Sequence, residues 1–199
     1  MDIAQIKRVT GAWMKAQEVL FVAAGVKPCG RQGYYDSELD AFLQMLKTLG
    51  LFFEISRFRV SLEDSDSFSN KGKVTNEKHG MRFVYFAKDQ LVASYAALAE
   101  AQGDVAALGS LLGYPSCCVQ YFKSHFTPEH TDLQLVSSDW RLNLSRRGED
   151  CCLLSHFPCG AQCASSIIIA DAYFACLSSH NAVYANTLKK NLLPGPHSV

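Results

Sequence analysis

Hydrophobic residues recur at helical spacing along most of this chain, and residues that start or stop helices lie between the hydrophobic stretches. These signals predict helices over residues 2–24 with a break at Gly11, 36–49, 89–102, 104–112, 115–126 and 159–189. The last of these segments is hydrophobic on nearly every side through its first half. Other elements must therefore pack around it, and we expect a long, central C-terminal helix.

Aromatic-rich and partly alternating runs predict a small sheet in the N-terminal half. Residues 51–62 and 81–87 are rich in aromatic and β-branched side chains, which favours two antiparallel strands. The short hydrophobic stretch 151–156 is a candidate for a further, buried strand. Residues 27–35 have the proline and glycine content of a turn, and the polar residues 63–80 predict a long loop. The expected fold class is α+β, mostly helical, with a small antiparallel sheet.

The length of 199 residues and the hydrophobic content of 48% fit one globular domain with a substantial core. We expect a single domain over residues 1–199. In this domain, N-terminal helices and a hairpin (1–87) precede a cysteine-rich helical core (88–190) and a short tail (191–199).

The charge balance and the hydrophobic runs argue against some classes of partner. Nineteen basic and nineteen acidic residues cancel, so no overall charge favours nucleic acid. The N-terminus lacks the order of a signal peptide, and the hydrophobic run 19–26 is too short to span a bilayer. We therefore expect a cytoplasmic protein without a membrane partner. Its eight cysteines should be thiols or metal ligands, since disulfides are rare in a reducing compartment.

His156, Cys159 and Cys163 fall within eight residues at the start of the last predicted helix. If that helix begins near Pro158, one turn separates the two cysteines and both thiols leave the same face. The positive end of the helix dipole then favours thiolate over thiol. The pattern predicts a metal site or a site of thiol chemistry.

Cys117 and Cys118 lie in the first turn of their own predicted helix, so two helix starts that carry thiols could converge. Successive residues on a helix point about 100° apart, so we expect only one of this pair to face the site. Cys118 is the better candidate because it shares a face with Tyr121, Phe122 and His125, which should turn inward.

The predicted ligand set consists of Cys118, His156, Cys159 and Cys163, with Cys117 and Ser166 as further candidates. Three thiolates and one imidazole suit zinc or an iron–sulfur cluster, and the sequence does not decide between these cofactors. In a metal-free alternative, a cysteine at a helix start is a nucleophile or redox centre and His156 is its base. The remaining cysteines are interpreted as small buried hydrophobic residues: Cys29, Cys151, Cys152 and Cys176.

Two segments of the C-terminal half also resemble a known family. Residues 108–122 read LGSLLGYPSCCVQYF, and residues 153–166 read LLSHFPCGAQCASS. This pair is similar to the uncharacterised prokaryotic family called domain of unknown function 483, over roughly residues 88–180. The matching positions are Gly109, Gly113, Tyr114, Pro115, Cys117, Cys118, Ser155, His156, Pro158, Cys159 and Cys163. The resemblance implies that the two segments form one site, and it brings no known reaction.

The chain has no glycine-rich phosphate loop, no G-x-S-x-G motif and no H-E-x-x-H motif, so the common nucleotide, hydrolase and metalloprotease classes find no support. The leading hypothesis is a cytosolic enzyme that uses a metal or an iron–sulfur cluster on a small-molecule substrate. The alternatives are a non-catalytic protein with a structural zinc site and a metal-free thiol enzyme. The sequence does not indicate an oligomeric state.

Overall fold

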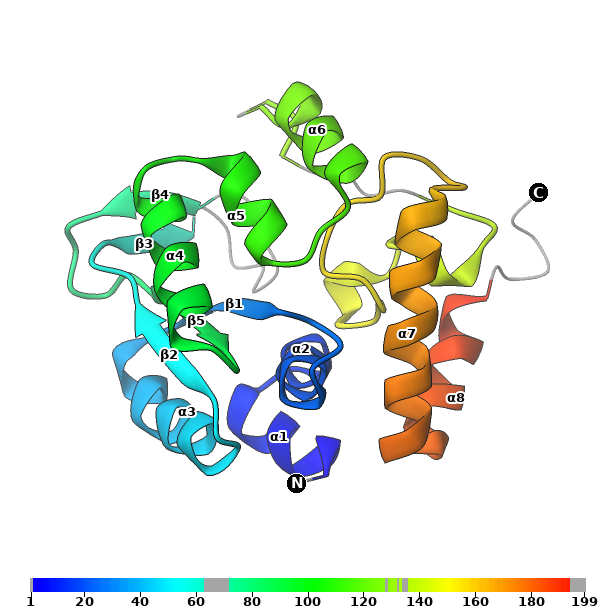
Figure 1. The fold of residues 1–199 in the computed structure, drawn as a ribbon, viewed down its shortest axis with the longest axis horizontal. Coiled ribbons are helices and arrows are strands. Elements are labelled where there is room, and N and C mark those ends of the chain that lie inside the picture. Colours follow the sequence, from blue (N-terminus) through cyan, green and yellow to red (C-terminus); the bar gives the residue numbers. More distant parts are fainter. Residues whose placement is uncertain (1, 63–71, 128, 132, 134–135, 194–199) are drawn as a thin grey trace.

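The computed structural model describes residues 2–62, 72–127, 129–131, 133 and 136–193. Its fold is α+β and mostly helical, as predicted (Figure 1). The helices are α1 (Ile3–Thr10), α2 (Trp13–Ala24), α3 (Asp36–Thr48), α4 (Gln90–Ala101), α5 (Val105–Leu111), α6 (Ser116–His125), α7 (Ala164–His180) and α8 (Ala182–Leu192). The strands are β1 (Cys29–Tyr34), β2 (Phe52–Ile55), β3 (Arg59–Leu62), β4 (Gly72–Thr75) and β5 (Arg82–Ala87). Among the described residues, no helix is both long enough and apolar enough to cross a membrane.

Strand β1 replaces the turn that was predicted over residues 27–35. It pairs with β5 in an antiparallel register that runs from Cys29 opposite Ala87 to Tyr34 opposite Arg82. Gly30 lies directly opposite Phe86, and a Cβ atom at Gly30 would overlap the ring of Phe86. The glycines of this segment therefore accommodate aromatic side chains of a neighbouring strand, which is a known use of glycine within sheets.

Residues 51–62 form two strands in different sheets, so the prediction of one continuous strand was wrong. β2 pairs with β5 and completes a three-stranded sheet in the order β1-β5-β2, whereas β3 pairs with β4. The chain turns at the buried Ser56, whose hydroxyl donates to the carbonyl of Phe58 at 2.7 Å and accepts from the N–H of Phe83 at 3.0 Å. Part of the predicted loop 63–80 is β4, and residues 63–71 lie outside the described residues.

Two predictions for the C-terminal half also need correction. Residues 151–156 are irregular and do not form a strand. The predicted helix over 159–189 begins only at Ala164 and is divided after His180. Asn181 causes the division, because its extended backbone leaves the helix and its side chain accepts from the N–H of Tyr184 at 2.9 Å, capping α8. The predicted tail overlaps the end of α8, and residues 194–199 are outside the described part of the chain.

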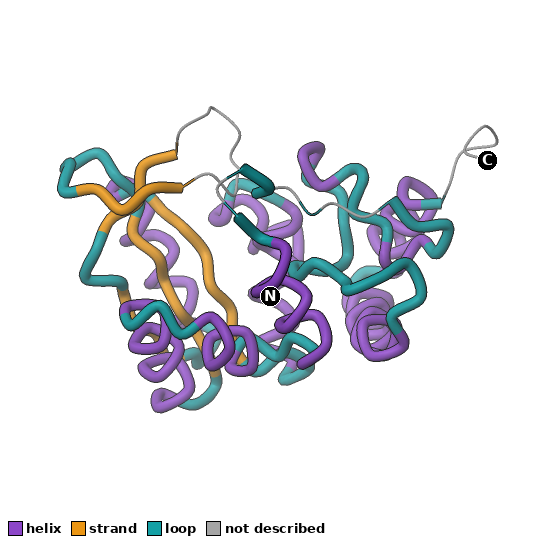
Figure 2. Tube along the Cα trace, turned by 90° about the horizontal axis from the view of Figure 1, so that it is seen from above, coloured by secondary structure: helices purple, strands orange, loops and turns teal. Residues whose placement is uncertain are grey.

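Helix α2 lies between the sheet and α7, and Figure 2 shows the strands at one end of the molecule with the C-terminal helices at the other. Every residue from Ala16 to Val22 is buried, so this helix forms the middle of the core. Its first turn is capped from the distant residue Asp150, which adopts a left-handed backbone with φ 58°. The carboxylate of Asp150 accepts from the N–H groups of Trp13 at 2.5 Å and Met14 at 2.9 Å.

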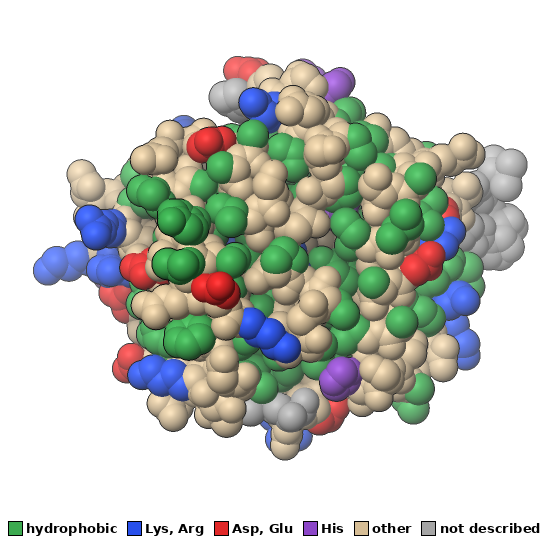
Figure 3. Space-filling model, in the orientation of Figure 1, with side chains coloured by type: hydrophobic (Ala, Val, Ile, Leu, Met, Phe, Trp, Pro, Cys, Tyr) green, Lys and Arg blue, Asp and Glu red, His purple; other side chains and the backbone are tan. Residues whose placement is uncertain are grey.

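Helix α4 covers the other face of the sheet with small side chains. Ala93, Ala96 and Ala99 are buried against the sheet and α5. Leu91, Tyr95 and Leu98 follow one another at helical spacing on the outer face and are exposed. Figure 3 shows hydrophobic side chains gathered over the region that Figure 1 assigns to α4.

The turn between α5 and α6 depends on Gly113, and its substitution should be costly. Gly113 has φ +77°, and a Cβ atom there would lie 2.6 Å from the Cδ atom of Pro28. Gly103 has a similar backbone, with φ +70°, but nothing within 4 Å of an added Cβ atom. We expect Gly103→Ala to cost about 1 kcal/mol from backbone strain and Gly113→Ala to cost about 1–3 kcal/mol more from overpacking. Urea unfolding measures both values, and equal losses would contradict the contact with Pro28.

Candidate metal centre

Four cysteines from two distant segments come together at one point. Cys117 and Cys118 lie in the first turn of α6, Cys159 lies in the loop before α7, and Cys163 is the N-cap residue directly before α7. Their four Sγ atoms all lie within 4.8 Å of one another. The helix start at Ser116 follows Pro115, whose φ of −57° suits the entry to a helix.

The sulfur atoms are in van der Waals contact without disulfide bonds. Sγ of Cys163 lies 3.6 Å from Sγ of Cys118 and 3.7 Å from Sγ of Cys117, and the adjacent pair is separated by 3.9 Å. These distances exceed the disulfide length of about 2.05 Å, and all four cysteines are free. The group therefore presents four unbridged sulfur atoms to one small volume.

Both members of the adjacent pair reach this volume, although we expected only Cys118 to do so. Cys118 is buried, whereas Cys117 is exposed. Both residues lie in the first turn of α6 and their Sγ atoms are 3.9 Å apart, so the 100° angle between neighbours does not exclude Cys117. Cys118 is buried as predicted, but of the residues expected to share its inward face Tyr121 and Phe122 are only partly buried and His125 is exposed.

Cys159 and Cys163 are brought together by a loop and not by one turn of helix. The N–H of Cys163 donates to the carbonyl of Gly160 at 3.2 Å, which closes the loop just before α7. The prediction that a helix begins near Pro158 was wrong, yet the spacing of four residues still places both sulfur atoms in the group.

His156 reaches the sulfur atoms only through the hydroxyl of Ser166. Its Nε2 atom is 2.8 Å from Oγ of Ser166, which in turn lies 3.2 Å from Sγ of Cys118. Ser166 is fully buried and His156 is only 5% exposed, with the ring of Tyr114 5.1 Å away between centroids. The structure thus places Cys117 beside the three predicted cysteines, and it places His156 behind Ser166, in the position of a residue that orients a ligand.

The buried imidazole of His156 is neutral. Burial, with a smaller contribution from the positive charge of Lys27, lowers the pKa of His156 to about 3. When Cys118 is a thiolate, the hydroxyl of Ser166 donates to its Sγ atom. His156 must then donate from Nε2 to Oγ of Ser166, because that oxygen has no second proton.

The thiols of Cys118, Cys159 and Cys163 do not ionise alike. Burial raises the pKa of Cys118, and burial together with neighbouring thiols raises that of Cys159 to about 11. Burial also opposes ionisation of Cys163, but hydrogen bonds from the hydroxyl and backbone N–H of Ser166, and from Cys159 and Cys118, lower its pKa to about 6. Without a cation Cys163 is therefore ionised more readily than Cys118 and Cys159, whereas a bound metal ion deprotonates its cysteine ligands.

The other cysteines are packed in the core, as predicted. All are buried and lie outside the sulfur group: Cys29, Cys151, Cys152 and Cys176. Cys152 donates to the carbonyl of Leu154 at 3.1 Å, and burial raises the pKa of Cys176. They behave as small hydrophobic residues.

Lys27 is a buried residue beside the centre that sequence reasoning missed. Its Nζ atom donates to the carbonyl of Leu112 at 3.0 Å and to Oγ of Ser155 at 3.3 Å, and it lies 3.3 Å from Oε1 of Glu18. Its side chain is completely inaccessible. Lys27 thereby connects α2 with both segments that carry the cysteines. No local signal predicts this, because a lysine before a proline in a short polar segment is usually exposed.

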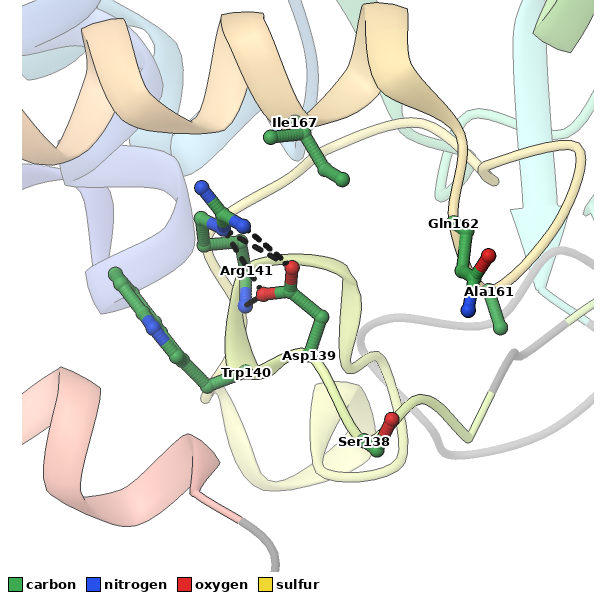
Figure 4. Close-up of a pocket in the computed structure, with 7 residues that line it drawn as sticks. All are labelled: Ser138, Asp139, Trp140, Arg141, Ala161, Gln162 and Ile167. Atoms are coloured by element: carbon green, nitrogen blue, oxygen red, sulfur yellow. Dashed lines mark hydrogen bonds and ion pairs between the residues drawn. The ribbon is translucent and has the colours of Figure 1, made fainter.

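An open cavity of about 480 Å³ adjoins the loop between Cys159 and Cys163 (Figure 4). Ala161 and Gln162 form one wall, and Ile167 of α7 and residues 138–141 form the others. The guanidinium of Arg141 is already paired with Asp139 at 2.6 Å and with Asp171 at 2.9 Å. Figure 4 shows the pair with Asp139. The lining therefore offers neutral polar groups and Trp140 to a ligand, and no cysteine of the sulfur group contributes to it.

The chain matches no family model, no curated protein and no solved structure. The geometry of the sulfur group is consequently the main guide to function. Four cysteines close together could hold a metal ion.

Proposed function

We propose that Cys117, Cys118, Cys159 and Cys163 bind one zinc ion, and that this ion has a structural role. The observation that carries the proposal is the mutual distance of the sulfur atoms. Four thiolates at about 2.3 Å from a tetrahedral zinc ion lie about 3.8 Å from one another. The separations of 3.6, 3.7 and 3.9 Å among Cys117, Cys118 and Cys163 agree with this value, and Sγ of Cys159 lies within 4.8 Å of each of them.

The same distances argue against an iron–sulfur cluster with four irons. In such a cluster each cysteine binds a different iron atom, so the thiolates lie much further apart than on a single ion. A single iron ion would accept the same tetrahedron of sulfur atoms, and its colour distinguishes it from zinc. Zinc is the simplest occupant because it is redox-inert and has no geometric preference that this group would violate.

The closed ligand set favours the structural alternative over the metal-dependent enzyme. Four thiolates complete a tetrahedron, whereas a catalytic zinc ion keeps one position for water or substrate. Helix α6 has only two fully buried residues, Cys118 and Val119, and its partly buried Phe122 packs against Phe157 of the C-terminal half. The ion would join α6 to the start of α7, while His156 would orient Cys118 through Ser166 and not bind the metal.

A cytoplasmic location and membership of the family called domain of unknown function 483 remain parts of this proposal. A reducing compartment keeps four neighbouring cysteines available for a metal. All four proposed ligands fall within the two segments that carry the resemblance.

The test is metal analysis of protein that is produced in metal-replete medium without chelator. We expect one zinc ion per chain and a colourless solution, and we expect Cys118→Ser, Cys159→Ser and Cys163→Ser each to remove stoichiometric zinc. Cys29→Ser and Cys176→Ser are matched controls, because these cysteines are buried outside the group and should retain the metal. Broad visible absorbance with inorganic sulfide would indicate a cluster, and wild-type protein without metal would overturn the proposal in favour of thiol chemistry.

A further inference from the structure

The four sulfur atoms differ in their access to solvent. Cys117 is exposed and Cys159 is partly exposed, whereas Cys118 is 2% and Cys163 9% exposed. The proposed centre therefore has a closed side, formed by Cys118, Cys163 and Ser166, and an open side at which Cys117 projects from the first turn of α6.

The sulfur atoms also differ in the hydrogen bonds that they accept. Sγ of Cys118 lies 3.2 Å from Oγ of Ser166, whose hydroxyl donates to it, and it also interacts with the backbone N–H of Cys159. Sγ of Cys163 interacts with the backbone N–H of Ser166. Within the described part of the chain, Cys117 has only sulfur neighbours, at 3.7 and 3.9 Å. Hydrogen bonds withdraw electron density from a thiolate, so Cys118 and Cys163 are shielded in a way that Cys117 is not.

Zinc bound to four thiolates leaves the centre with a formal charge of −2, and a metal-bound cysteine is a thiolate at neutral pH. A thiolate is the nucleophilic form of cysteine, and metal coordination is one of the ways in which proteins activate it. We propose that Cys117 is the metal-activated nucleophile of this centre and accepts alkyl groups from small, soft carbon electrophiles. This inference rests on the proposed zinc site, and it assigns a reactive function to one of its ligands.

The step is a simple substitution, written here for the probe iodoacetamide. Sγ of Cys117 attacks the methylene carbon, a sulfur–carbon bond forms, and the carbon–iodine bond breaks. Iodide leaves with the bonding electron pair, and no proton is taken up or released. Cys117 becomes a neutral thioether, so the formal charge of the centre changes from −2 to −1. A thioether binds zinc more weakly than a thiolate, so we expect alkylation to loosen the ion.

The experiment treats zinc-loaded wild-type protein with about one equivalent of iodoacetamide. Peptide mass spectrometry locates the modified cysteine, and a colorimetric zinc indicator follows release of the ion. We expect Cys117 to react about tenfold faster than Cys159, the only other partly exposed ligand. We also expect Cys117→Ser to slow alkylation of the whole protein by a similar factor, whereas Cys176→Ser, the buried control, should react like wild type.

The possible outcomes separate this inference from the zinc proposal. Stoichiometric zinc with first modification at Cys159, Cys118 or Cys163 would overturn the role of Cys117 and leave the zinc site intact. Protein that contains no zinc before treatment would overturn both. The peptide map of the wild-type protein decides the order of reaction even if Cys117→Ser folds poorly.

Discussion

Chelation of zinc from the folded protein should release helix α6 from the C-terminal half while α3 stays protected. The reason is that α6 has only two fully buried residues, Cys118 and Val119, so the metal would add a strong link to the start of α7 beside the packing of Phe122 on Phe157. Loss of a structural metal belongs to the largest class of single effects, and we expect the free energy of unfolding to fall by about 4 kcal/mol or more. Urea unfolding with and without excess chelator measures this loss.

Hydrogen exchange locates the effect of chelation. Backbone amides of residues 116–125 should exchange much faster in the apoprotein, with residues 36–48 as the internal reference. Cys163→Ser provides a matched control, because a protein that has already lost the ion should not respond to chelator. An apoprotein with unchanged stability and unchanged exchange in α6 would show that the ion is not structural, and it would favour a catalytic metal instead.

Lys27→Met should be the most damaging substitution outside the cysteine group. Lys27 is inaccessible to solvent, and its Nζ atom lies 3.3 Å from Oε1 of Glu18. The glutamate side chain is itself only 10% exposed, so removal of the lysine leaves a nearly buried carboxylate without its countercharge. Breaking such a pair from one side costs about 3–5 kcal/mol. Equilibrium unfolding in urea gives the value directly.

The double variant Glu18→Gln/Lys27→Met distinguishes loss of the charge pair from loss of packing. It removes both charges, so we expect it to recover a large part of the stability that Lys27→Met loses. Gln32, whose amide donates to Oε2 of Glu18 at 3.1 Å, can still donate to the new glutamine. Lys47→Met on the exposed face of α3 is the control and should change stability little. A loss below about 1 kcal/mol for Lys27→Met would contradict the importance of the pair.

The helices up to residue 126 could be predicted because their signals are local. Asp104 caps α5 with its side chain, as its position before a hydrophobic helical run suggested, and Asp89, which was expected inside α4, caps that helix. Gly11 ends α1 in the left-handed conformation that stops a helix. Each of these features needs only a few neighbouring residues.

The sheet could be predicted only in part because its strands depend on distant partners. The glycines of β1 have the composition of a turn, and their role becomes clear only when Phe86 lies opposite Gly30. The stretch 151–156 has the hydrophobicity of a strand, but it is held by side-chain and loop contacts, such as that between the carbonyl of Cys152 and the amide of Gln17. The hydrophobicity of this stretch indicated that it is buried. It did not indicate whether its backbone pairs with another strand.

Sequence reasoning selected the four cysteines that the structure brings together, three as predicted ligands and Cys117 as a further candidate. The position of His156 could not be predicted, because it depends on the hydrogen bond to Ser166 ten residues later and on burial beneath Tyr114. Whether the group binds a metal stays a prediction. Spacing indicates which side chains can meet, but it does not determine which of them lie in direct contact.

The four cysteines occur as two close pairs, with forty residues between Cys118 and Cys159. Either pair can bind zinc through two thiolates while the chain is still unfolded. The other two thiolates can bind the ion only after the segment between the pairs has formed a closed loop. Closure of a loop of this length costs roughly 3 kcal/mol of chain entropy. The unfolded chain therefore competes for the same ion. Saturating zinc would raise the free energy of unfolding by less than the binding free energy of zinc at the complete native site.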